Sequence, residues 1–592
     1  MKTLIVVESP NKARKLTEYL GKDYIVLASG GHICDLAKGG QYGIGVDVDN
    51  DFKPHYMLMK EKVGLLNEII EAASMADIIL LGTDHDREGE AIAYHLQRYL
   101  SSVNKPTKRI SFGEITKSAI IKAIENAHDI DMNIVKSQEA RRSLDRIVGF
   151  LVSPMLHSFY GSNNLSAGRV QSVATRLIID REQEISSFIP DEFWNIAAKF
   201  ITPTNETFIA KFNTKPKNKA DADVVVASIK NQPEFYVAKI ISQEKKEKPC
   251  PPLITASLQQ YMAKKHSFEP DRTMKAAQNL YENGFCTYIR TDSIRSSKEA
   301  ISSVREWIKE KYELPTKPNA YAAKGSSQDA HEAIRPTNIN NIPEGSILAG
   351  DEKDVYTAIW KHFVASQMCP AIWDTMQVNI CSKTDPKILF NVSGKALKHN
   401  GYLEIFGDID PGKIDIPNLH EKDILKLAAD AKAEQKFTQP AARYNDASII
   451  KELETKQIGR PATYAEIIKK ITARNYVEKQ GNTYRPTELG KKITTTLISL
   501  FPFMEFDYSA MLEKKLDDIE HGELEQLAML KEFFGPFKQQ LNKAYISNGN
   551  TLCEKCSGPM ITRTVKTNGN TFLGCSNWPR CKNTKSTEVA AA

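Results

Sequence analysis

The sequence predicts a multidomain protein of mixed class, in which an α/β domain is joined to α+β segments and to a small cysteine-rich module. Three observations support this prediction. Roughly the first 100 residues alternate short apolar runs with helical patterns, as in a Rossmann-like parallel sheet. Two strand-rich blocks, near 190–245 and 372–440, flank a helical block. Four of the nine cysteines lie together after residue 550.

Length and composition describe a chain with several folded cores. It has 592 residues, of which 26% are charged and 41% apolar, and roughly 150 residues per domain predicts about four domains. These fractions exclude global disorder. No apolar run approaches the ~18–20 residues of a membrane span, and Leu4–Val7 is too short for the core of a signal peptide. We therefore expect a cytoplasmic protein with no membrane contact.

The net charge is a modest +6. The segment after Asn550 contributes four of these charges, with six Lys and Arg residues against two Glu residues. Because so little charge is left for the rest of the chain, bulk charge does not identify an acidic partner. A binding site for an acidic partner would need a local basic patch.

The N-terminal segment predicts a sheet with helices on its faces. Thr3–Val7 is apolar and β-branched, and Ser9-Pro10 opens a helical pattern because proline fits the first helical turn. Asp77–Gly82 is a continuous apolar run, typical of a strand buried on both faces. We expect strands at Thr3–Val7, Tyr24–Ala28 and Asp77–Gly82, and helices at Asn11–Leu20, Glu61–Ala73 and Glu88–Leu100. These elements define a domain at 1–128, with an insertion at about 32–58.

The rest of the chain alternates between helical and strand-rich segments. Asp131–Glu184 predicts helices with a break at Pro154, and Phe193–Ala238 shows strand-like alternation. Glu244–Pro252 is charged and then proline-rich, which predicts a linker. Further helices are expected at Leu258–Phe285, Ser297–Tyr312, Asp351–Met368, Ala447–Asn475 and Met511–Tyr545, and strands within Thr375–Ile405. The predicted domains are 129–189 with 441–546, 190–250 with 370–440, 251–369 and 547–592.

An acidic cluster follows the buried strand. Asp84 and Asp86 come directly after it, and Glu8 ends the first strand. Because ligands bind at the carboxyl ends of parallel strands, these acids are expected at one edge of the sheet. Mg²⁺ takes carboxylate, water and phosphate oxygens, so the cluster predicts a Mg²⁺ site. The alternative is a solvated acidic turn at a helix N-terminus.

Residues suited to phosphate chemistry occur at three places. Lys12 lies one helical turn after Glu8, at a helix N-terminus facing the same edge. Tyr288 and Arg290 share one face of an extended segment, and a tyrosine oxygen is a competent nucleophile when a cation stabilises the phenolate. His331 can orient a phosphate. The alternatives are an exposed lysine, a polar lead into a helix and a surface turn.

A segment of small residues points to nucleic acid. It places an arginine and a glutamine beside small side chains that let a backbone strand approach closely. The segment comprises Ser166, Ala167, Gly168, Arg169, Val170 and Gln171. Arg141, Arg142 and Asp145 lie on a helix just upstream. The alternative is a solvated helix face with salt bridges.

The C-terminal cysteines predict a zinc site. Cys553 and Cys556 form a C-x₂-C pair, and Cys575 and Cys581 form a C-x₅-C pair eighteen residues later. Four such cysteines in two knuckles specify tetrahedral, structural Zn²⁺ ligation. The positive charge of the module and its aromatic residues suit stacking on single-stranded nucleic acid. The alternative is a purely structural or protein-binding ribbon.

Together and in this order, the motifs resemble those of the type IA DNA topoisomerases. The resemblance covers about residues 1–545 together with the cysteine module, and it is carried by Val7–Pro10, Thr83–Glu90 (TDHDREGE), Phe112–Thr116 (FGEIT), Ala140–Arg146, Leu165–Ala174 (LSAGRVQSVA), Arg272–Tyr281 (RTMKAAQNLY), Thr287–Ser293, His331–Thr337 and Ile458–Ala465 (IGRPATYA). The form Tyr-Ile-Arg-Thr-Asp-Ser is more similar to bacterial topoisomerase I than to topoisomerase III.

The resemblance implies a fold and a mechanism. The N-terminal sheet would be a Toprim domain that binds Mg²⁺ through Glu8, Asp84 and Asp86 with Glu88 nearby, and the other domains would form a toroidal arch. Tyr288 would attack one strand of negatively supercoiled DNA and become joined to its 5′-phosphate. Another strand would pass through the gap, and the free 3′-hydroxyl would reseal it without ATP. Arg290 and Lys12 would stabilise the scissile phosphate, His331 would contact a neighbouring phosphate, and Glu8 would help to move a proton.

The resemblance also implies a path for a single DNA strand. The matching positions are His32, Arg141, Arg142, Asp145, residues 166–171, Thr463 and Arg474. The chain departs from the family pattern in three ways. The loop Gly39–Gly45 is longer than expected, which affects contacts near His32. Phe150 and His157 stand where a tyrosine and a tryptophan are expected, and one four-cysteine module is fewer than many bacterial relatives carry.

Three other functions remain open at this stage. A topoisomerase III-like decatenase would differ in its balance of relaxation and decatenation. Another Toprim enzyme, such as a primase or nuclease, would not need Tyr288. A non-catalytic DNA-binding protein with a zinc ribbon would bind DNA without relaxing it. We expect a monomer that is associated with the bacterial nucleoid.

Overall fold

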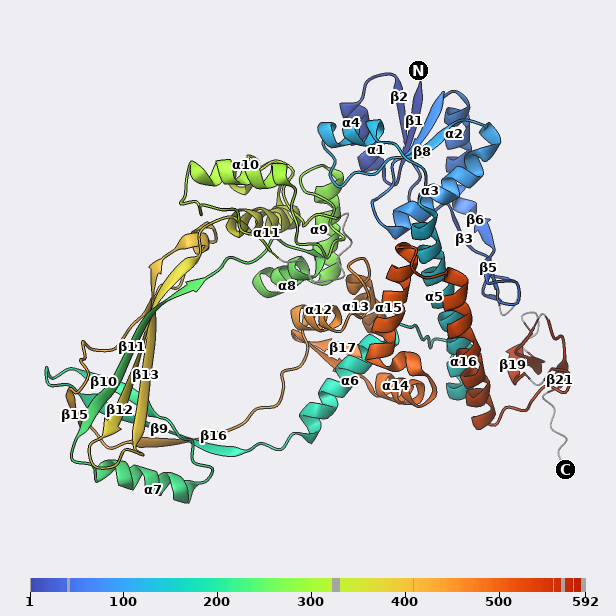
Figure 1. Ribbon diagram of the computed structural model, residues 1–592. Coiled ribbons are helices and arrows are strands. Elements are labelled where there is room, and N and C mark those ends of the chain that lie inside the picture. Colours follow the sequence, from blue (N-terminus) through green and yellow to red (C-terminus); the bar gives the residue numbers. More distant parts are fainter. Residues whose placement is uncertain are drawn as a thin grey trace, which may run out of the picture.

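The computed structural model describes residues 2–39, 43–321, 331–407, 409–556, 558–565, 570–578 and 580–586. In Figure 1 the chain surrounds an open centre, with a β-rich part on one side and helical parts above and opposite. The loop Gly39–Gly45, expected to be long, lies partly outside the described residues. No helix in the described ranges is long and apolar enough to cross a membrane.

The N-terminal part is a parallel four-stranded sheet with helices on both faces. The strand order is β2-β1-β7-β8, and all three pairings are parallel. The strands are β1 (Thr3–Val7), β2 (Tyr24–Ala28), β7 (Ile78–Leu81) and β8 (Thr107–Arg109), and the helices are α1 (Pro10–Tyr19), α2 (Val63–Ser74), α3 (Arg87–Leu100) and α4 (Lys117–Glu125). Ile5 and Val7 of β1 pack with α1 and α4, whereas Leu4 and Val6 pack with α2 and α3. The continuous apolar pattern of β1 is explained by burial on both faces.

The insertion in this sheet consists of two small antiparallel ladders. One pairs β3 (Cys34–Leu36) with β6 (Tyr56–Leu58), and the other pairs β4 (Val46–Asp47) with β5 (Lys53–Pro54). The insertion begins after β2 and leads into α2. Its Phe52 packs edge-on against Phe534, with ring centroids 5.6 Å apart.

Two distant chain segments build one helical core. The first holds α5 (Met132–Tyr160) and α6 (Gln171–Ser187), and the second holds α12 (Asp446–Thr455), α13 (Tyr464–Ala473), β17 (Val477–Gln480), β18 (Thr483–Pro486), α14 (Glu488–Leu500), α15 (Phe506–Glu520) and α16 (Gln526–Ser547). Their buried side chains form one apolar cluster. The expected break at Pro154 is wrong, because α5 continues through this proline to Tyr160. Contacts with α15 and α16 along α5 offset the lost backbone hydrogen bond.

The strand-rich blocks combine into a closed antiparallel barrel. Its strands are β9 (Glu192–Ile201), β10 (Thr207–Phe212), β11 (Phe235–Glu247), β12 (Ala371–Ser382), β13 (Leu389–His399), β14 (Gly412–Lys413), β15 (Ile424–Leu427) and β16 (Lys432–Phe437). Because β10 pairs with both β13 and β9, and β15 joins β9 to β11, the sheet closes on itself. The helix α7 (Lys219–Lys230) contacts β9 and β16. Phe200, Phe235 and Phe390 fill the core, with centroid distances of 5.1–5.9 Å.

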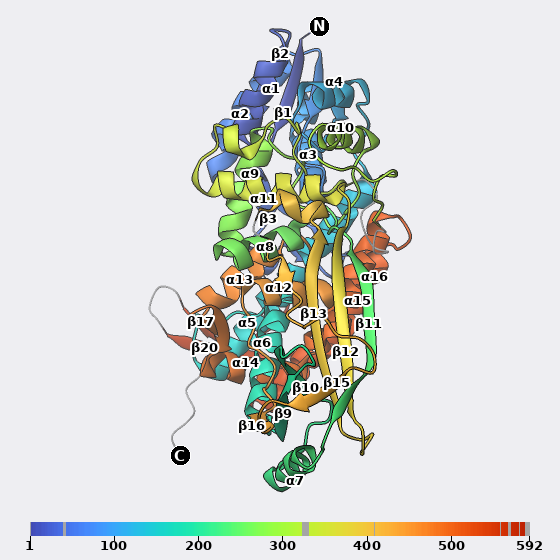
Figure 2. The same cartoon turned by 90° about the vertical axis from the view of Figure 1, so that its left-hand side faces the viewer.

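Long strands connect this barrel to the remaining helical part. Figure 2 shows β11, β12 and β13 running side by side away from the barrel. The linker expected at Glu244–Pro252 is partly wrong, because residues up to Glu247 pair with β12. The helices α8 (Thr255–His266), α9 (Pro270–Glu282), α10 (Lys298–Lys309) and α11 (Gly350–Ser366) follow. Their apolar side chains share a core with β1 and α1, so this part is fastened to the N-terminal sheet.

The C-terminal module is a three-stranded antiparallel sheet of β19 (Met560–Thr564), β20 (Thr571–Cys575) and β21 (Thr584–Ser586). It contacts both α16 and the insertion of the N-terminal sheet. Lys538 of α16 donates to the Asn577 side chain over 2.9 Å, and Arg580 pairs with Asp49 over 2.7 Å. These polar contacts hold the module beside the helical core.

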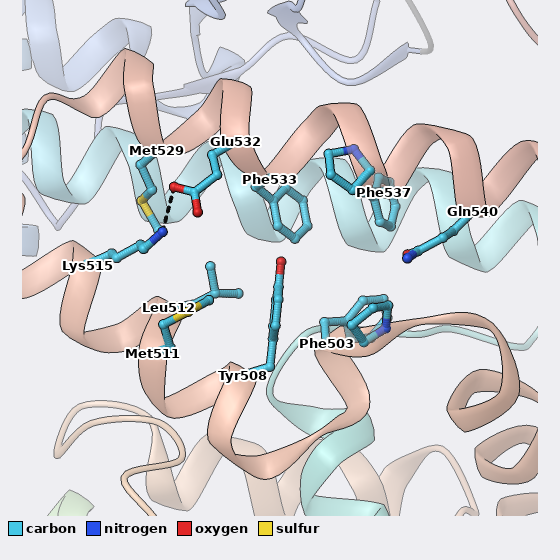
Figure 3. Close-up of a pocket in the computed structure, with 12 residues that line it drawn as sticks. Phe503, Tyr508, Met511, Leu512, Lys515, Met529, Glu532, Phe533, Phe537 and Gln540 are labelled. Carbon is cyan, nitrogen blue, oxygen red and sulfur yellow. Dashed lines mark hydrogen bonds and ion pairs between the residues drawn. The ribbon is translucent and has the colours of Figure 1, made fainter.

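An apolar cavity of about 240 Å³ lies between α15, α16 and the turn Pro502–Met504 (Figure 3). Phe503, Tyr508 and Phe533 line it. The only ion pair drawn at the cavity joins Lys515 to Glu532 over 2.5 Å. The cavity holds no cluster of chemically reactive side chains, so it is a packing feature of the helical core.

The aromatic core of the barrel predicts a large difference between two substitutions. Phe390→Ala removes a fully buried ring and is expected to cost about 3–5 kcal/mol of unfolding free energy. Ile209→Ala, on the same barrel but 62% exposed, is expected to cost less than about 0.5 kcal/mol. Hydrogen exchange of the β12 and β13 amides measures both values. Equal protection in the two variants would contradict the assignment of this core.

Candidate active site and zinc centre

A buried ion cluster lies at the carboxyl ends of β1 and β7. The Lys12 ammonium is fully buried, hydrogen-bonds the Asp84 carboxylate and lies 3.6 Å from the Glu8 carboxylate. The Asp84 backbone N–H donates to the Glu8 side chain over 3.1 Å. The lysine is therefore not the exposed residue of the alternative interpretation, and all three side chains face the same edge of the sheet.

Local sequence explains why these side chains converge. The Ser9 hydroxyl caps α1 by accepting from the Lys12 N–H, which turns Lys12 back toward the end of β1. The Asp86 carboxylate caps α3 by accepting from the Gly89 N–H over 2.8 Å. A side chain at Gly89 would lie 2.1 Å from the Asp84 carbonyl oxygen. Only glycine lets α3 begin this close to the acidic turn.

Tyr288 reaches this cluster from a segment 200 residues away. Its hydroxyl donates to the Asp86 carboxylate, and the Arg290 guanidinium lies 3.4 Å from the same carboxylate oxygen. The backbone N–H of Tyr288 donates to the Gly113 carbonyl over 2.8 Å. Tyr288 is 4% exposed. The two motifs that the sequence linked only by resemblance thus meet at one carboxylate.

The electrostatics of the cluster reflect burial and crowded negative charge. Burial and the neighbouring Asp84 charge raise the pKa of Glu8 to about 8. Burial also acts on Asp84, but the adjacent Lys12 ammonium lowers its pKa below the ordinary value. Burial and the Asp86 and Asp84 charges raise the pKa of Tyr288 well above its ordinary value. The phenol is therefore protonated at neutral pH and needs a proton acceptor in order to act as a nucleophile.

Glu88 lies in a different set of contacts from the other acids. Its carboxylate binds the His32 ring nitrogen over 2.9 Å and accepts from the Gln138 amide over 3.1 Å. Burial opposes the ionised form, but these hydrogen bonds lower the pKa of Glu88 to about 2. Glu88 thus links α3 to α5. The acidic cluster is therefore centred on the other three acids, Glu8, Asp84 and Asp86.

The His331 ring lies close to the tyrosine. Its ring centroid is 5.8 Å from that of Tyr288, and its Nε2 atom hydrogen-bonds the His85 carbonyl oxygen. Its Nδ1 atom is buried without a hydrogen-bond partner among the described residues. This free nitrogen leaves His331 able to contact a ligand beside Tyr288.

The predicted DNA-binding arginines occupy two different environments. Arg142 is partly exposed and pairs with Asp35 of the insertion. Arg169, by contrast, is 1% exposed and pairs with Glu513 over 2.7 Å and with Asp145 over 3.3 Å. Its side chain therefore lies inside the helical core in this structure. Arg141 also pairs with Glu513, over 3.1 Å.

The segment 166–171 is held by side chains from elsewhere. The Ser166 N–H donates to the Tyr476 hydroxyl over 2.7 Å, and the Ala167 N–H donates to the Ser153 hydroxyl over 3.1 Å. A side chain at Gly168 would lie 2.9 Å from Gln171. Val170 is half-buried and packs against the helical core.

The remaining predicted contacts surround this segment. Arg474 donates to the Asn164 carbonyl over 3.3 Å, and Thr463 accepts from the Arg460 N–H over 2.9 Å. His157 binds the Leu165 carbonyl through Nε2 over 2.6 Å. Phe150 is 40% exposed, with the Arg146 guanidinium 4.6 Å from its ring centroid. His157 of α5 thus holds the residue that precedes the segment, whereas Phe150 packs under Arg146 of its own helix.

Two features of the site were not predicted from the sequence. Tyr281, in the RTMKAAQNLY motif, is fully buried with its ring centroid 5.3 Å from that of Tyr288 and 5.2 Å from the Lys12 ammonium. Glu513 is a buried acid that joins Arg141 and Arg169. The motif gave a signal for Tyr281, whereas nothing local marks Glu513, because Arg141 and Arg169 lie more than 340 residues away from it.

The four C-terminal cysteines form a compact metal site. Their sulfur atoms all lie within 4.8 Å of one another, and theirs is the one such group of metal-ligand side chains that we find in the described part of the chain. The Asn583 and Asn577 amides donate to the Cys553 and Cys556 sulfurs, each over 3.3 Å. Burial opposes the thiolate, but these and backbone hydrogen bonds lower the pKa of Cys553 to about 6. This donor set fits structural Zn²⁺.

Comparisons with known families agree with this geometry. Residues 129–531 match the model of the DNA topoisomerase family. The chain belongs to the type IA DNA topoisomerases. Residues 3–115 match the Toprim domain, and residues 550–589 match the topoisomerase DNA-binding C4 zinc finger.

Two relatives show how far this topoisomerase resembles known members. DNA topoisomerase 1 of Vibrio cholerae is 37% identical over 648 aligned residues, which cover 98% of this chain and 73% of that protein. The full-length topoisomerase I of Thermotoga maritima superposes with a TM-score of 0.80 at 33% identity, covering 99% of this chain and 97% of that one. The chain is thus an enzyme of the bacterial topoisomerase I type, with DNA as its partner.

The close approach at Gly89 predicts a strong effect of one methyl group. Gly89→Ala is expected to displace the Asp84–Asp86 turn, to cost about 1–3 kcal/mol of stability and to abolish strand cleavage. Gly64→Ala is the matched control, because its new Cβ meets nothing within 4 Å and removes only backbone freedom. Thermal unfolding and a plasmid assay measure both effects. A fully active Gly89→Ala enzyme would refute the steric argument.

The cysteine cluster predicts a single zinc ion. Metal analysis of the purified chain is expected to give about one Zn²⁺ per molecule. Cys553→Ser is expected to lose this zinc and the exchange protection of β19 and β20. Cys250→Ser changes an exposed cysteine outside the cluster and is expected to retain it. Zinc retained after both substitutions would refute the assignment.

Proposed function

We propose that this topoisomerase relaxes negatively supercoiled DNA by Mg²⁺-dependent cleavage of one strand through Tyr288. The observation that carries the proposal is the Asp86 carboxylate, which binds the Tyr288 hydroxyl and lies beside Arg290. A nucleophile, a proton acceptor and a cation for the phosphate therefore stand together. The Lys12–Asp84–Glu8 cluster adjoins them through the turn that begins α3.

Residues of this chain can supply and accept the protons that strand cleavage moves. The Tyr288 oxygen would attack phosphorus as its proton passes to Asp86, which already accepts its hydrogen bond. A bond to the 5′-phosphate would form, and the bond to the 3′ oxygen would break. Glu8, which lies beside the turn that begins α3, would help to move a proton to the departing 3′ oxygen. Religation would reverse these transfers and needs no ATP, because the phosphotyrosine bond replaces the broken linkage.

The acidic cluster fits a hard cation. Glu8, Asp84 and Asp86 bring carboxylate oxygens together at one edge of the sheet, and such oxygens are the ligands that Mg²⁺ prefers. Glu8, Asp84 and Asp86 would hold Mg²⁺, whose charge would stabilise phosphate oxygens. Arg290 and Lys12 would bind the scissile phosphate, and His331 would contact its neighbour.

We place the bound single strand along α5 and the segment 166–171. The partly exposed His32 and Arg142 lie at this surface, together with Arg474. The buried Arg169 and the partly buried Arg141 would act through the position of α5, or would change partners when DNA binds. The predicted division into five domains, a monomeric state and a location with DNA in the bacterial cytoplasm belong to the same proposal.

A plasmid experiment tests the cleavage step. Wild-type enzyme is expected to relax negatively supercoiled plasmid with Mg²⁺ and without ATP, and denaturation during turnover is expected to leave protein on DNA 5′ ends. Tyr288→Phe is expected to lose both activities, because no other hydroxyl replaces the nucleophile. The control is Tyr356→Phe, which removes a buried hydroxyl that donates to the Asn341 carbonyl, far from the acidic cluster in sequence.

The outcomes separate the candidate functions. Relaxation by Tyr288→Phe, or adducts at 3′ ends, would refute the proposed nucleophile. DNA binding without relaxation by the wild type would favour a non-catalytic role. Decatenation that exceeds relaxation under the same conditions would favour a topoisomerase III-like activity.

A further inference from the structure

The tyrosine-bearing helical part meets the N-terminal sheet across a partly open interface. A cavity of about 780 Å³ lies between them, lined on one side by Ser111, Glu114 and Ser118 and on the other by Ser303 and Glu332. Tyr288 also lines this cavity. Water that enters this space can solvate charged groups on either side when the two parts separate.

Arg335 connects the two sides of this interface. It is 6% exposed and pairs with Glu332 of its own segment over 2.7 Å and with Glu114 of the N-terminal part over 2.9 Å. The Thr116 hydroxyl donates to the other Glu114 oxygen over 3.2 Å. From the sequence, Arg335 of the His331–Thr337 motif was a candidate for gripping a phosphate. The structure shows no phosphate-facing role for it, because both carboxylates occupy its guanidinium.

Few charged contacts cross this interface in the described residues. Apart from Arg290 with Asp86 at the active site, the Arg335–Glu114 pair is the one ion pair between residues 2–128 and the described residues of 250–369. The other contacts include the Tyr288 N–H with the Gly113 carbonyl and the Asn11 amide with Glu282. The charged pair therefore makes a distinct contribution to keeping the parts together.

The arrangement of two carboxylates would let Arg335 keep one partner when the parts separate. A buried charge that loses its sole partner is strongly destabilised. Arg335 avoids this, because Glu332 moves with it and stays paired after Glu114 is lost. Glu114 itself borders the cavity and is released into water. Opening of the interface would thus leave no unpaired buried charge.

We infer that Glu114 and Arg335 form a reversible clasp that controls separation of the tyrosine-bearing part from the N-terminal sheet. Glu332 is the positioning residue that lowers the free energy of opening. The inference rests on the proposed function, in which the two parts must separate for a strand to pass. It assigns a controlling ion pair to that movement, whereas the chemistry at Tyr288 is left unchanged.

Two neighbouring amides report on the clasp without requiring activity. The Tyr288 N–H donates across the interface to the Gly113 carbonyl over 2.8 Å. The Thr287 N–H donates to the Arg335 carbonyl over 2.9 Å, and both of these residues belong to the tyrosine-bearing part. Hydrogen exchange of the full chain without DNA, resolved to single residues, measures both. The exchange rate at Tyr288 reports opening of the interface, and the exchange rate at Thr287 reports unfolding of the tyrosine-bearing part.

The expected changes have opposite signs in two isosteric variants. Glu114→Gln is expected to speed exchange at Tyr288 about tenfold, the loss of one charge-assisted contact, and to leave Thr287 unchanged. Glu332→Gln is expected to slow exchange at Tyr288, because opening would then leave Arg335 unpaired. Arg335→Lys keeps the charge, so the Tyr288 exchange rate of this variant is expected to lie between those of the wild type and Glu114→Gln.

The inference is overturned if Glu114→Gln leaves Tyr288 exchange unchanged, if both amides speed up equally, or if Glu332→Gln speeds exchange as Glu114→Gln does. The formation of 5′ adducts on single-stranded DNA is measured in parallel and is expected to stay near the wild-type level in both variants. Failure of the proposed nucleophile would abolish the wild-type adduct without changing the exchange pattern. The two proposals can therefore fail separately.

Discussion

The active site depends on one shared carboxylate. Asp86 caps α3 with one oxygen and binds the Tyr288 hydroxyl with the other. The first contact fixes the start of a helix next to the end of β7. The second fastens a segment 200 residues away to that helix end. Any shift of α3 therefore moves the proton acceptor relative to the nucleophile. Gly89 lets α3 begin at this place, because a Cβ there would lie 2.1 Å from the Asp84 carbonyl oxygen.

Charge compensation organises the surrounding protein. Lys12 is buried against Asp84, Glu88 is held by His32 and Gln138, and buried arginines surround Glu513. Each of these ions would be costly alone in the interior, and each is paired by a residue from another element. The pairs therefore define how the sheet, α5 and α15 lie relative to one another. Charge compensation of the same kind occurs at Arg335, whose guanidinium pairs with two carboxylates.

The chain order explains how a rigid site is combined with separable parts. The barrel is built from two segments, and β11 and β12 lead from it to either end of the tyrosine-bearing part. This part is thus covalently attached only through the long strands, while its other contacts, to the sheet and to α12 and α13, are non-covalent. A barrel with an aromatic core provides a firm base for such an attachment.

Local sequence determined the elements and the chemistry, and tertiary structure decided the partners. The apolar run of β7, the Ser9 cap and the spacing of four cysteines are local signals, so the sheet, the acidic turn and the zinc centre were predictable. Pro154 was misjudged because packing along α5 outweighs one lost hydrogen bond. Glu244–Glu247 looked like a linker because strand pairing with distant residues is invisible locally. The burial of Arg169, the role of Glu513 and the two partners of Arg335 depend on side chains up to several hundred residues away, and only folding brings those charges together.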